Sequence, residues 1–185
     1  MEAAQPKPLL MVDIDGVVSL FGVPADAIDE PAQGSLHSIE GIRHFLSSTA
    51  AAHLLALSEL FELVWASGWE EKANEHLPHL LGLPAEMPFL RFSRDLGARG
   101  QTHAHWKLEA IEAYARERPL AWIDDAFNAA CHEWANARPA PTLLVRTDPA
   151  QGLTSREAKL LASWARGLEA GPESTTARAK ELRTG

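Results

Sequence analysis

The chain has 185 residues, the size of one globular domain. With 46% apolar and 23% charged residues it is too apolar for a disordered protein, and a net charge of −8 disfavours non-specific binding to nucleic acid or to an anionic membrane. A single cysteine, Cys131, excludes a disulfide within the chain and a zinc site built from several cysteines.

The sequence contains neither a membrane span nor a secretory leader. No apolar stretch reaches the roughly 18 residues that a bilayer span requires. The first residues include an acid and two prolines, and the apolar run from Leu9 to Val12 ends at Asp13, which is not typical of a signal peptide. These features predict a cytoplasmic protein without a membrane partner, and nothing in the sequence indicates an oligomeric state.

Short β-rich runs alternate with longer helical runs along the chain. Strands are predicted at 9–14, 62–66, 89–92, 120–123 and 142–145, and helices at 49–60, 70–81, 104–118, 126–137 and from 154 onward. Because such alternation is typical of crossovers between parallel strands, it predicts an α/β fold with a parallel sheet of about five strands.

One segment before the first helix has a different pattern. Residues 36–39 and 42–45 are separated by Glu40-Gly41, and glycine at the second turn position supplies the positive φ of a tight hairpin. A β-hairpin is therefore predicted, although the segment can also start a long helix.

The chain is predicted to form one domain over residues 8–167. From Leu168 onward the apolar pattern gives way to Gly, Pro, Ser, Thr and mixed charges. Residues 1–7 and 168–185 are therefore predicted to be flexible termini.

Two carboxylates, Asp13 and Asp15, end the first apolar run and precede Gly16. Such a pair can form a divalent-cation site in which one carboxylate is also free to attack an electrophile. An Asp-Gly pair is equally typical of a hairpin turn, but Gly22 and Pro24 do not suit a return strand.

Three further polar motifs follow in order. Ser67-Gly68 can present a hydroxyl and backbone N–H groups to a phosphate, or cap the next helix. Lys107 lies early in a helix, where a lysine is usually solvated. Asp124-Asp125 ends the fourth predicted strand and can cap a helix or bind a metal. The carboxylate and hydroxyl motifs end parallel strands, at the edge where open α/β sheets bind ligands.

Trp69 differs from the other tryptophans. Those at 65, 122, 134 and 164 fall in apolar patterns and are predicted to lie in the core. Trp69 follows Ser67 by two residues and is predicted to reach the mouth of a site there, where its ring could stack.

The combination of these motifs resembles the haloacid dehalogenase (HAD) superfamily, over about residues 8–166. The residues are D-x-D-G-V at 13–17, Ser67, Lys107 and the acidic pair at 124–125. The segments around 64–70 and 81–84 resemble the HAD domain of Swiss army knife RNA-repair proteins. The resemblance implies a three-layer Rossmann-like core, and the short insertions imply a hairpin flap and no large cap.

The resemblance also implies a phosphohydrolase that acts through an aspartyl-phosphate. Asp13 would be the nucleophile and Asp15 the general acid and base. Ser67 and Gly68 would bind the substrate phosphate. Lys107 would offset charge around the nucleophile and the transferring group.

A Mg²⁺ cofactor is implied by the same resemblance. Its ligands would be the Asp13 carboxylate, the backbone carbonyl of Asp15 and Asp124, with or without Asp125.

The expected partner is a phosphorylated substrate, either a small phosphomonoester or a nucleic-acid terminal phosphate. The net charge does not favour nucleic acid unless Arg91, Arg94 and Arg99 form a local positive patch with Lys107. A phosphoacceptor signalling domain and a non-catalytic HAD-like binding module are the alternatives. Asp15 argues against the first, since a slow acceptor has little need of a second acid.

Overall fold

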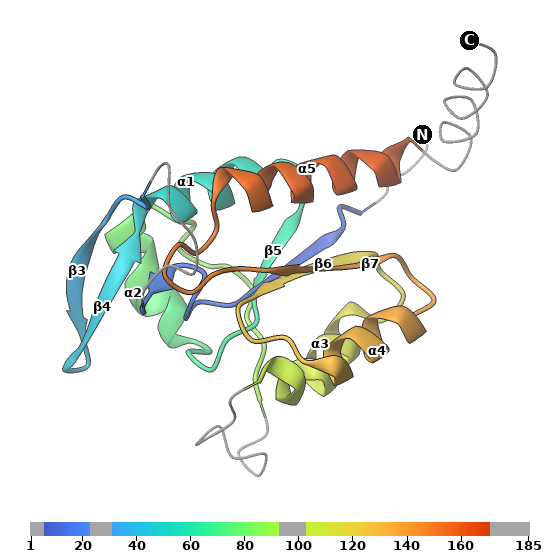
Figure 1. The fold of residues 1–185 in the computed structure, drawn as a ribbon, viewed down its shortest axis with the longest axis horizontal. Coiled ribbons are helices and arrows are strands. Elements are labelled where there is room, and N and C mark those ends of the chain that lie inside the picture. The colour runs from blue at the N-terminus through green and yellow to red at the C-terminus, as the bar shows by residue number, and fades with distance from the viewer. Residues whose placement is uncertain (1–5, 23–30, 93–102, 171–185) are drawn as a thin grey trace.

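The structure is a computed structural model that describes residues 6–22, 31–92 and 103–170. Its centre is a parallel sheet with the strand order β5-β1-β6-β7 (Figure 1). The strands are β1 (Leu9–Val12), β5 (Glu62–Trp65), β6 (Leu120–Asp124) and β7 (Thr142–Arg146). The predicted α/β class with a Rossmann-like parallel sheet is confirmed.

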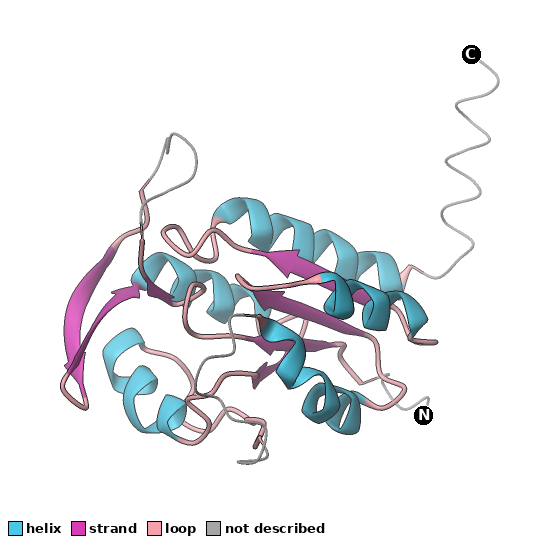
Figure 2. Cartoon of the chain, turned by 60° about the horizontal axis from the view of Figure 1, so that its bottom comes forward, coloured by secondary structure: helices cyan, strands magenta, loops and turns pink. Residues whose placement is uncertain are grey.

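Helices cover both faces of this sheet. They are α1 (Ser48–Leu57), α2 (Lys72–Leu81), the 3₁₀ helix η2 (Ala104–Lys107), α3 (Leu108–Ala115), α4 (Ala129–Ala137) and α5 (Ser155–Glu169). Helices α1 and α5 lie on one face and α3 and α4 on the other (Figure 2). The fold therefore has three layers.

Strand β1 shows how the sequence produces these layers. Leu10 and Val12 pack with the layer of α1 and α5, whereas Leu9 and Met11 pack with the layer of α3 and α4. Successive side chains of a strand point to opposite faces, and all four are fully buried. A strand covered on both faces is therefore apolar throughout. The tryptophans predicted for the core also pack there, Trp65 and Trp122 fully and Trp134 and Trp164 in part.

A second, antiparallel sheet lies at the side toward which the parallel strands point (Figure 2). Its strands are β2 (Ser19–Leu20), β3 (Gly34–Ile39) and β4 (Ile42–Ser47), in the order β2-β4-β3. Glu40 and Gly41 have φ angles of 49° and 82°, as a two-residue turn with two positive φ angles requires. The predicted hairpin is confirmed.

The predicted fifth strand at 89–92 is wrong. Phe89 forms a single parallel bridge with Trp65. Beyond that bridge the Phe92 N–H donates to Glu70 Oε1 at 2.8 Å, so the backbone bonds to a side chain instead of extending the ladder. The parallel sheet has four strands and one isolated bridge at its edge.

Helix ends follow side-chain caps rather than the apolar pattern. The Ser47 hydroxyl accepts from the Ala50 N–H at 3.0 Å, so α1 starts earlier than predicted. Asn128 caps α4 and delays its start. The predicted capping box of Thr154 and Glu157 at α5 is confirmed.

The chain ends are described only in part. Helix α5 continues to Glu169, and residues 1–5 and 171–185 lie outside the described ranges. The domain bounds of 8–167 stay a prediction. Among residues 6–22, 31–92 and 103–170, no helix is long and apolar enough to cross a membrane.

Gly152 allows the backbone just before α5 to pack closely against the loop that follows β1. It has a φ of 68°, and a Cβ there would lie 2.3 Å from the Val17 carbonyl oxygen. The neighbouring Leu153 N–H donates to that same oxygen at 3.0 Å. The backbones approach too closely for any side chain at this position.

Gly152→Ala should destabilise the protein more than Gly41→Ala. Both positions have positive φ, but a Cβ at Gly41 meets nothing within 4 Å. Each change costs about 1–2 kcal/mol of backbone strain, and overlap adds roughly 1–3 kcal/mol at Gly152 alone. Urea unfolding measures both losses, and equal losses would contradict the close approach.

Candidate active site

Polar groups meet at the carboxyl edge of the parallel sheet. The register pairs Val12 with Trp65 on one side and with Ile123 on the other. The carboxyl ends of β1, β5 and β6 therefore lie at about the same height along the sheet edge. Asp13 and Asp124 therefore lie next to each other. Strand β1 lies between β5 and β6, so the chain leaves β1 to one side for β5 and returns to its other side for β6. The end of β1 is therefore the topological switch point, where open α/β sheets bind ligands.

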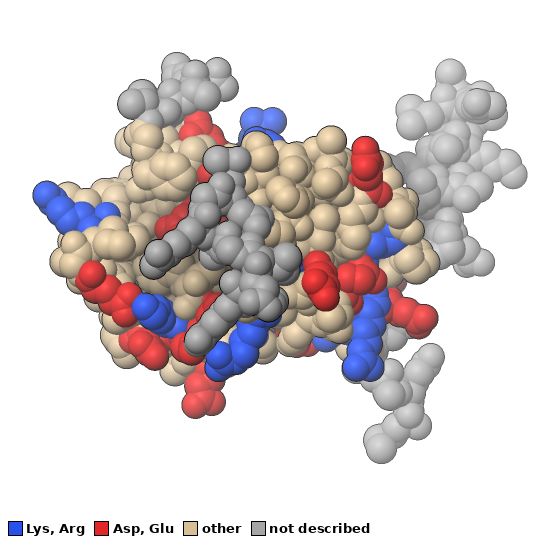
Figure 3. Space-filling view, turned by 90° about the horizontal axis from the view of Figure 1, so that it is seen from below, with Lys and Arg blue, Asp and Glu red and all other residues tan. Residues whose placement is uncertain are grey.

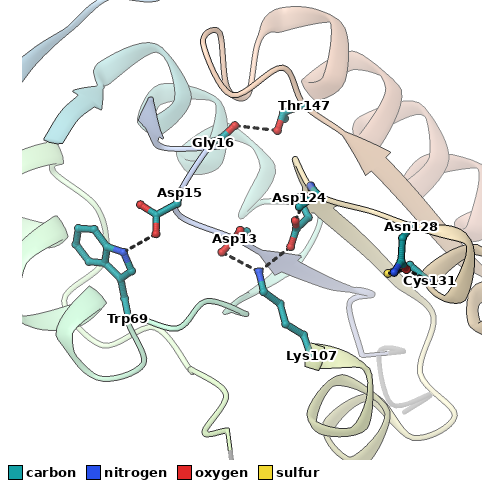
Figure 4. Close-up of polar contacts among 10 residues, drawn as sticks. Asp13, Asp15, Gly16, Trp69, Lys107, Asp124, Asn128, Cys131 and Thr147 are labelled. Carbon is teal, nitrogen blue, oxygen red and sulfur yellow. Dashed lines mark hydrogen bonds and ion pairs between the residues drawn. The ribbon is translucent and has the colours of Figure 1, made fainter. Parts of the chain in front are cut away.

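Lys107 connects the two aspartates (Figure 4). Its Nζ lies 2.9 Å from Asp13 Oδ1 and 2.7 Å from Asp124 Oδ2. Lys107 is 3% exposed, Asp13 7% and Asp124 1%, so this lysine is not a solvated helix residue. The other Asp124 oxygen accepts from the Ala126 N–H at 3.0 Å, so Asp124 both caps a turn and belongs to the site.

Burial and charge oppose each other in this cluster. Burial raises the pKa of Asp13 from its ordinary 3.8 to about 7, Lys107 opposes the rise and Asp124 adds to it. Burial, with help from Asp124, also raises the pKa of Asp125. Burial alone would lower the pKa of Lys107, but its two carboxylate partners hold it above its ordinary value.

Three carboxylates surround one ammonium group, and this excess of negative charge suits a cation. Asp13, Asp124 and Asp125 each offer an oxygen, and these oxygens lie within 4.8 Å of one another. An all-oxygen, anionic donor set is the one that Mg²⁺ prefers. The residues therefore fit the expected Mg²⁺.

Gly16 lets Asp125 approach the chain after Asp15. It has a φ of 75°, and a Cβ there would lie 2.6 Å from Asp125 Cγ. The Thr147 hydroxyl donates to the Gly16 carbonyl at 2.8 Å, in a buried position. The glycine of the D-x-D-G motif is thus required both for its turn and for the space it leaves.

Asp15 points away from the Lys107 cluster (Figure 4). Its Oδ2 accepts from Trp69 Nε1 at 3.0 Å. The Trp69 ring meets the His44 ring edge-on at 4.9 Å, and His44 Nδ1 lies 2.9 Å from Ser19 Oγ. The sequence placed Trp69 near the site but gave no sign of the bond to Asp15, because that bond depends on how the loops after β1 and β5 fold.

One cavity of about 460 Å³ contains the whole predicted set. Its lining includes Asp13, Asp15, Ser67, Gly68, Lys107, Asp124 and Asp125. Ser67 does not cap α2, whose N-cap is Glu71. In the described parts of the chain no group hydrogen-bonds to the Ser67 hydroxyl, so it is available to a ligand in the cavity.

The predicted arginine patch finds no support in the described residues. Arg91 lies 3.3 Å from Glu71 in an exposed ion pair and does not line the cavity. Arg94 and Arg99 lie outside the described ranges. On the face shown in Figure 3, the coloured Lys and Arg side chains lie among Asp and Glu and form no continuous basic surface.

A family comparison agrees with the geometry. The model for the HAD domain in Swiss Army Knife RNA repair proteins matches residues 9–158. This range contains the four parallel strands and the seven predicted site residues. No curated protein and no solved structure matches the chain.

Without divalent cations, wild-type protein should lose stability relative to Asp13→Asn as the pH rises from about 4 to about 7. The pKa of Asp13 is raised from 3.8 to about 7 on folding, so in this window the folded state holds a proton that the unfolded state has released. Stability from this group is therefore present below the window and lost across it. Urea unfolding in a chelator at several pH values measures the difference.

At pH 7.5, added Mg²⁺ should raise the free energy of unfolding of the wild type and raise that of Asp13→Asn by less. A ligand stabilises the state that binds it, and the variant lacks one carboxylate of the site. Parallel pH profiles for the two proteins, with no response to Mg²⁺, would contradict both the burial of Asp13 and the metal site.

Proposed function

Because the chain belongs to the family of HAD domains in Swiss Army Knife RNA repair proteins, we propose that it is a phosphohydrolase that cleaves phosphate monoesters through Asp13. The observation that supports this most is the pairing of a buried Asp13, held by Lys107, with an exposed Asp15 held by Trp69. Two carboxylates two residues apart have opposite environments, which suits two different roles.

In the first half of the reaction, Asp13 attacks the phosphorus and the bond to the leaving oxygen breaks. Lys107 binds Asp13 Oδ1 at 2.9 Å, and no other described group donates to Oδ2, which is the attacking atom. Asp15 gives its proton to the leaving oxygen, so the alcohol departs neutral and Asp13 carries the phosphoryl group.

In the second half, Asp15 takes a proton from water, and the resulting oxygen attacks the phosphorus. The bond to Asp13 breaks and inorganic phosphate leaves. The Ser67 hydroxyl and the Gly68 N–H bind phosphoryl oxygens from the cavity wall. Lys107 offsets charge on the same group, as in-line phosphoryl transfer requires.

Mg²⁺ would be held by Asp13, Asp124 and Asp125, with the Asp15 backbone carbonyl as a further ligand. When bound, it would supply neutralisation of the carboxylates and of the phosphoryl oxygens. Oxygen donors within 4.8 Å of one another and the raised pKa of Asp13 support this cofactor.

The substrate that we favour is a terminal phosphate of a nucleic acid. The family name points to RNA repair, and the described residues that line the cavity belong to the domain core rather than to a separate cap domain, which suits the end of a long molecule. The net charge of −8 argues for recognition of an end rather than of a long backbone. A small phosphomonoester is the other member of this substrate class.

A phosphoacceptor domain would retain its phosphoryl group instead of turning over. The hydrogen bond that fixes Asp15 beside the cavity favours hydrolysis, because an acceptor gains nothing from a positioned acid and base.

Asp13→Asn should lower phosphate release by roughly 10⁴-fold or more, as expected for an essential nucleophile. Release is measured from aryl phosphate and from oligonucleotides with 5′- or 3′-terminal phosphate, with and without Mg²⁺. Asp148→Asn is the matched control, since Asp148 follows β7 but does not line the cavity. Near-normal turnover by Asp13→Asn would exclude the aspartyl-phosphate route.

Asp15→Asn should slow hydrolysis of an alkyl phosphate more than that of an aryl phosphate. An aryl oxide leaves without much help from a proton, whereas an alkoxide needs one. Steady-state kcat on the two substrates gives the comparison. Equal losses would remove Asp15 from the role of acid.

A further inference from the structure

The catalytic cavity adjoins a second hollow, the hairpin pocket, which lies between the β3–β4 hairpin and the start of α2. Its volume is about 270 Å³, and its lining includes Asp15, Ile39, Ile42, His44, Trp69 and Lys72. We propose that the hairpin pocket binds a planar ring on the leaving alcohol of the substrate, and that this ring is a nucleobase. The proposal rests on the proposed function, which assigns Asp15 to the leaving group.

The two hollows share three lining residues. Asp15, Gly68 and Trp69 line both of them. An acid that protonates the leaving oxygen must be within hydrogen-bond reach of it. The leaving alcohol therefore lies beside Asp15, on the side away from the Lys107 cluster, and the rest of that alcohol extends toward the hairpin.

The walls of the hairpin pocket suit a flat, apolar ring. The register pairs Ile39 with Ile42, and cross-strand partners share a face. His44, two residues after Ile42, lies on that face and meets the Trp69 ring edge-on at 4.9 Å. Ile42 is 63% exposed, so it offers apolar surface that a ligand can cover.

Polar groups stand at the rim, where they can meet the edge of a base. Lys72 Nζ and Glu40 Oε2 form an exposed ion pair at 2.5 Å, and His76 also lines the pocket. A few polar groups beside apolar walls are how small-molecule sites fix orientation. The volume is below the roughly 300–1,000 Å³ typical of drug-sized ligands, so the pocket admits one ring system.

Matched substrates test the proposal with the wild-type protein. Adenosine 5′-monophosphate and ribose 5-phosphate have the same leaving oxygen and differ only in the base, and adenosine 3′-monophosphate covers the other terminus. We expect kcat/KM to be about tenfold or more higher for at least one nucleotide than for the sugar phosphate, as base stacking on aromatic side chains allows. Benzyl phosphate against ethyl phosphate tests a ring without polar edges.

Two hairpin variants show whether the pocket causes the preference. Ile42→Asp should lower the ratio of nucleotide to sugar-phosphate kcat/KM by about fivefold or more. Leu36→Asp is the control, because Leu36 is 58% exposed on the same hairpin but pairs with Phe45 on the opposite face. It should leave the ratio unchanged. Both side chains are exposed, and thermal unfolding confirms that each variant folds.

A third variant separates the ring of Trp69 from its N–H. Trp69→Phe keeps an aromatic wall but loses the donor to Asp15. It should lower kcat on nucleotide and sugar phosphate together and preserve most of the ratio.

The outcomes distinguish the two claims. Equal kcat/KM for nucleotides and ribose 5-phosphate, or a ratio that Ile42→Asp does not change, overturns the hairpin pocket while the phosphohydrolase stands. A preference for benzyl phosphate alone keeps a ring site and overturns the nucleobase. If the protein releases phosphate from none of these substrates and not from aryl phosphate either, the proposed function is wrong, and the proposal for the hairpin pocket is wrong as well.

Discussion

The buried ammonium of Lys107 is the group on which the site depends. At 3% exposure it is almost fully buried, and a buried charge is tolerated only when paired and hydrogen-bonded. Its two partners come from the ends of β1 and β6, and the lysine itself comes from η2. One ion-pair cluster therefore fixes three separate elements at the switch point.

The same cluster contains more negative charge than one lysine can balance. Burial, with a contribution from Asp124, raises the pKa of Asp13 to about 7 and also raises the pKa of Asp125. A divalent cation would remove this imbalance and restore Asp13 to the ionised form that a nucleophile needs. Metal binding, folding stability and nucleophilicity are thus coupled through one set of charges. The Asp15 side chain points away from these groups and accepts a hydrogen bond from Trp69 Nε1 (Figure 4).

What the sequence predicted followed from local rules. A buried strand must be apolar throughout, and its polar end must lie at the sheet edge, so Asp13 and Asp124 could be located from pattern alone. The role of Lys107 came only from family resemblance, since its burial depends on how η2 packs. The prediction of a strand at 89–92 was wrong because the Phe92 N–H donates to the Glu70 side chain. The β propensity of these residues does not reveal that contact. The bond of Trp69 to Asp15 joins residues 54 positions apart, and it depends on the tertiary arrangement of the loops after β1 and β5.

That hairpin gives a small domain a way to connect recognition with chemistry. Ser19 in β2 contacts His44 in β4, His44 contacts Trp69, and Trp69 holds Asp15. Because His44 and Trp69 also line the hairpin pocket, a ring bound there would contact the groups that orient Asp15, the proposed acid. Under the proposed function, the three short strands would do two things that a cap does, namely contact the leaving group and align the acid. The binding energy of the leaving group can then act on the position of Asp15, where it lowers the barrier rather than only tightening the complex.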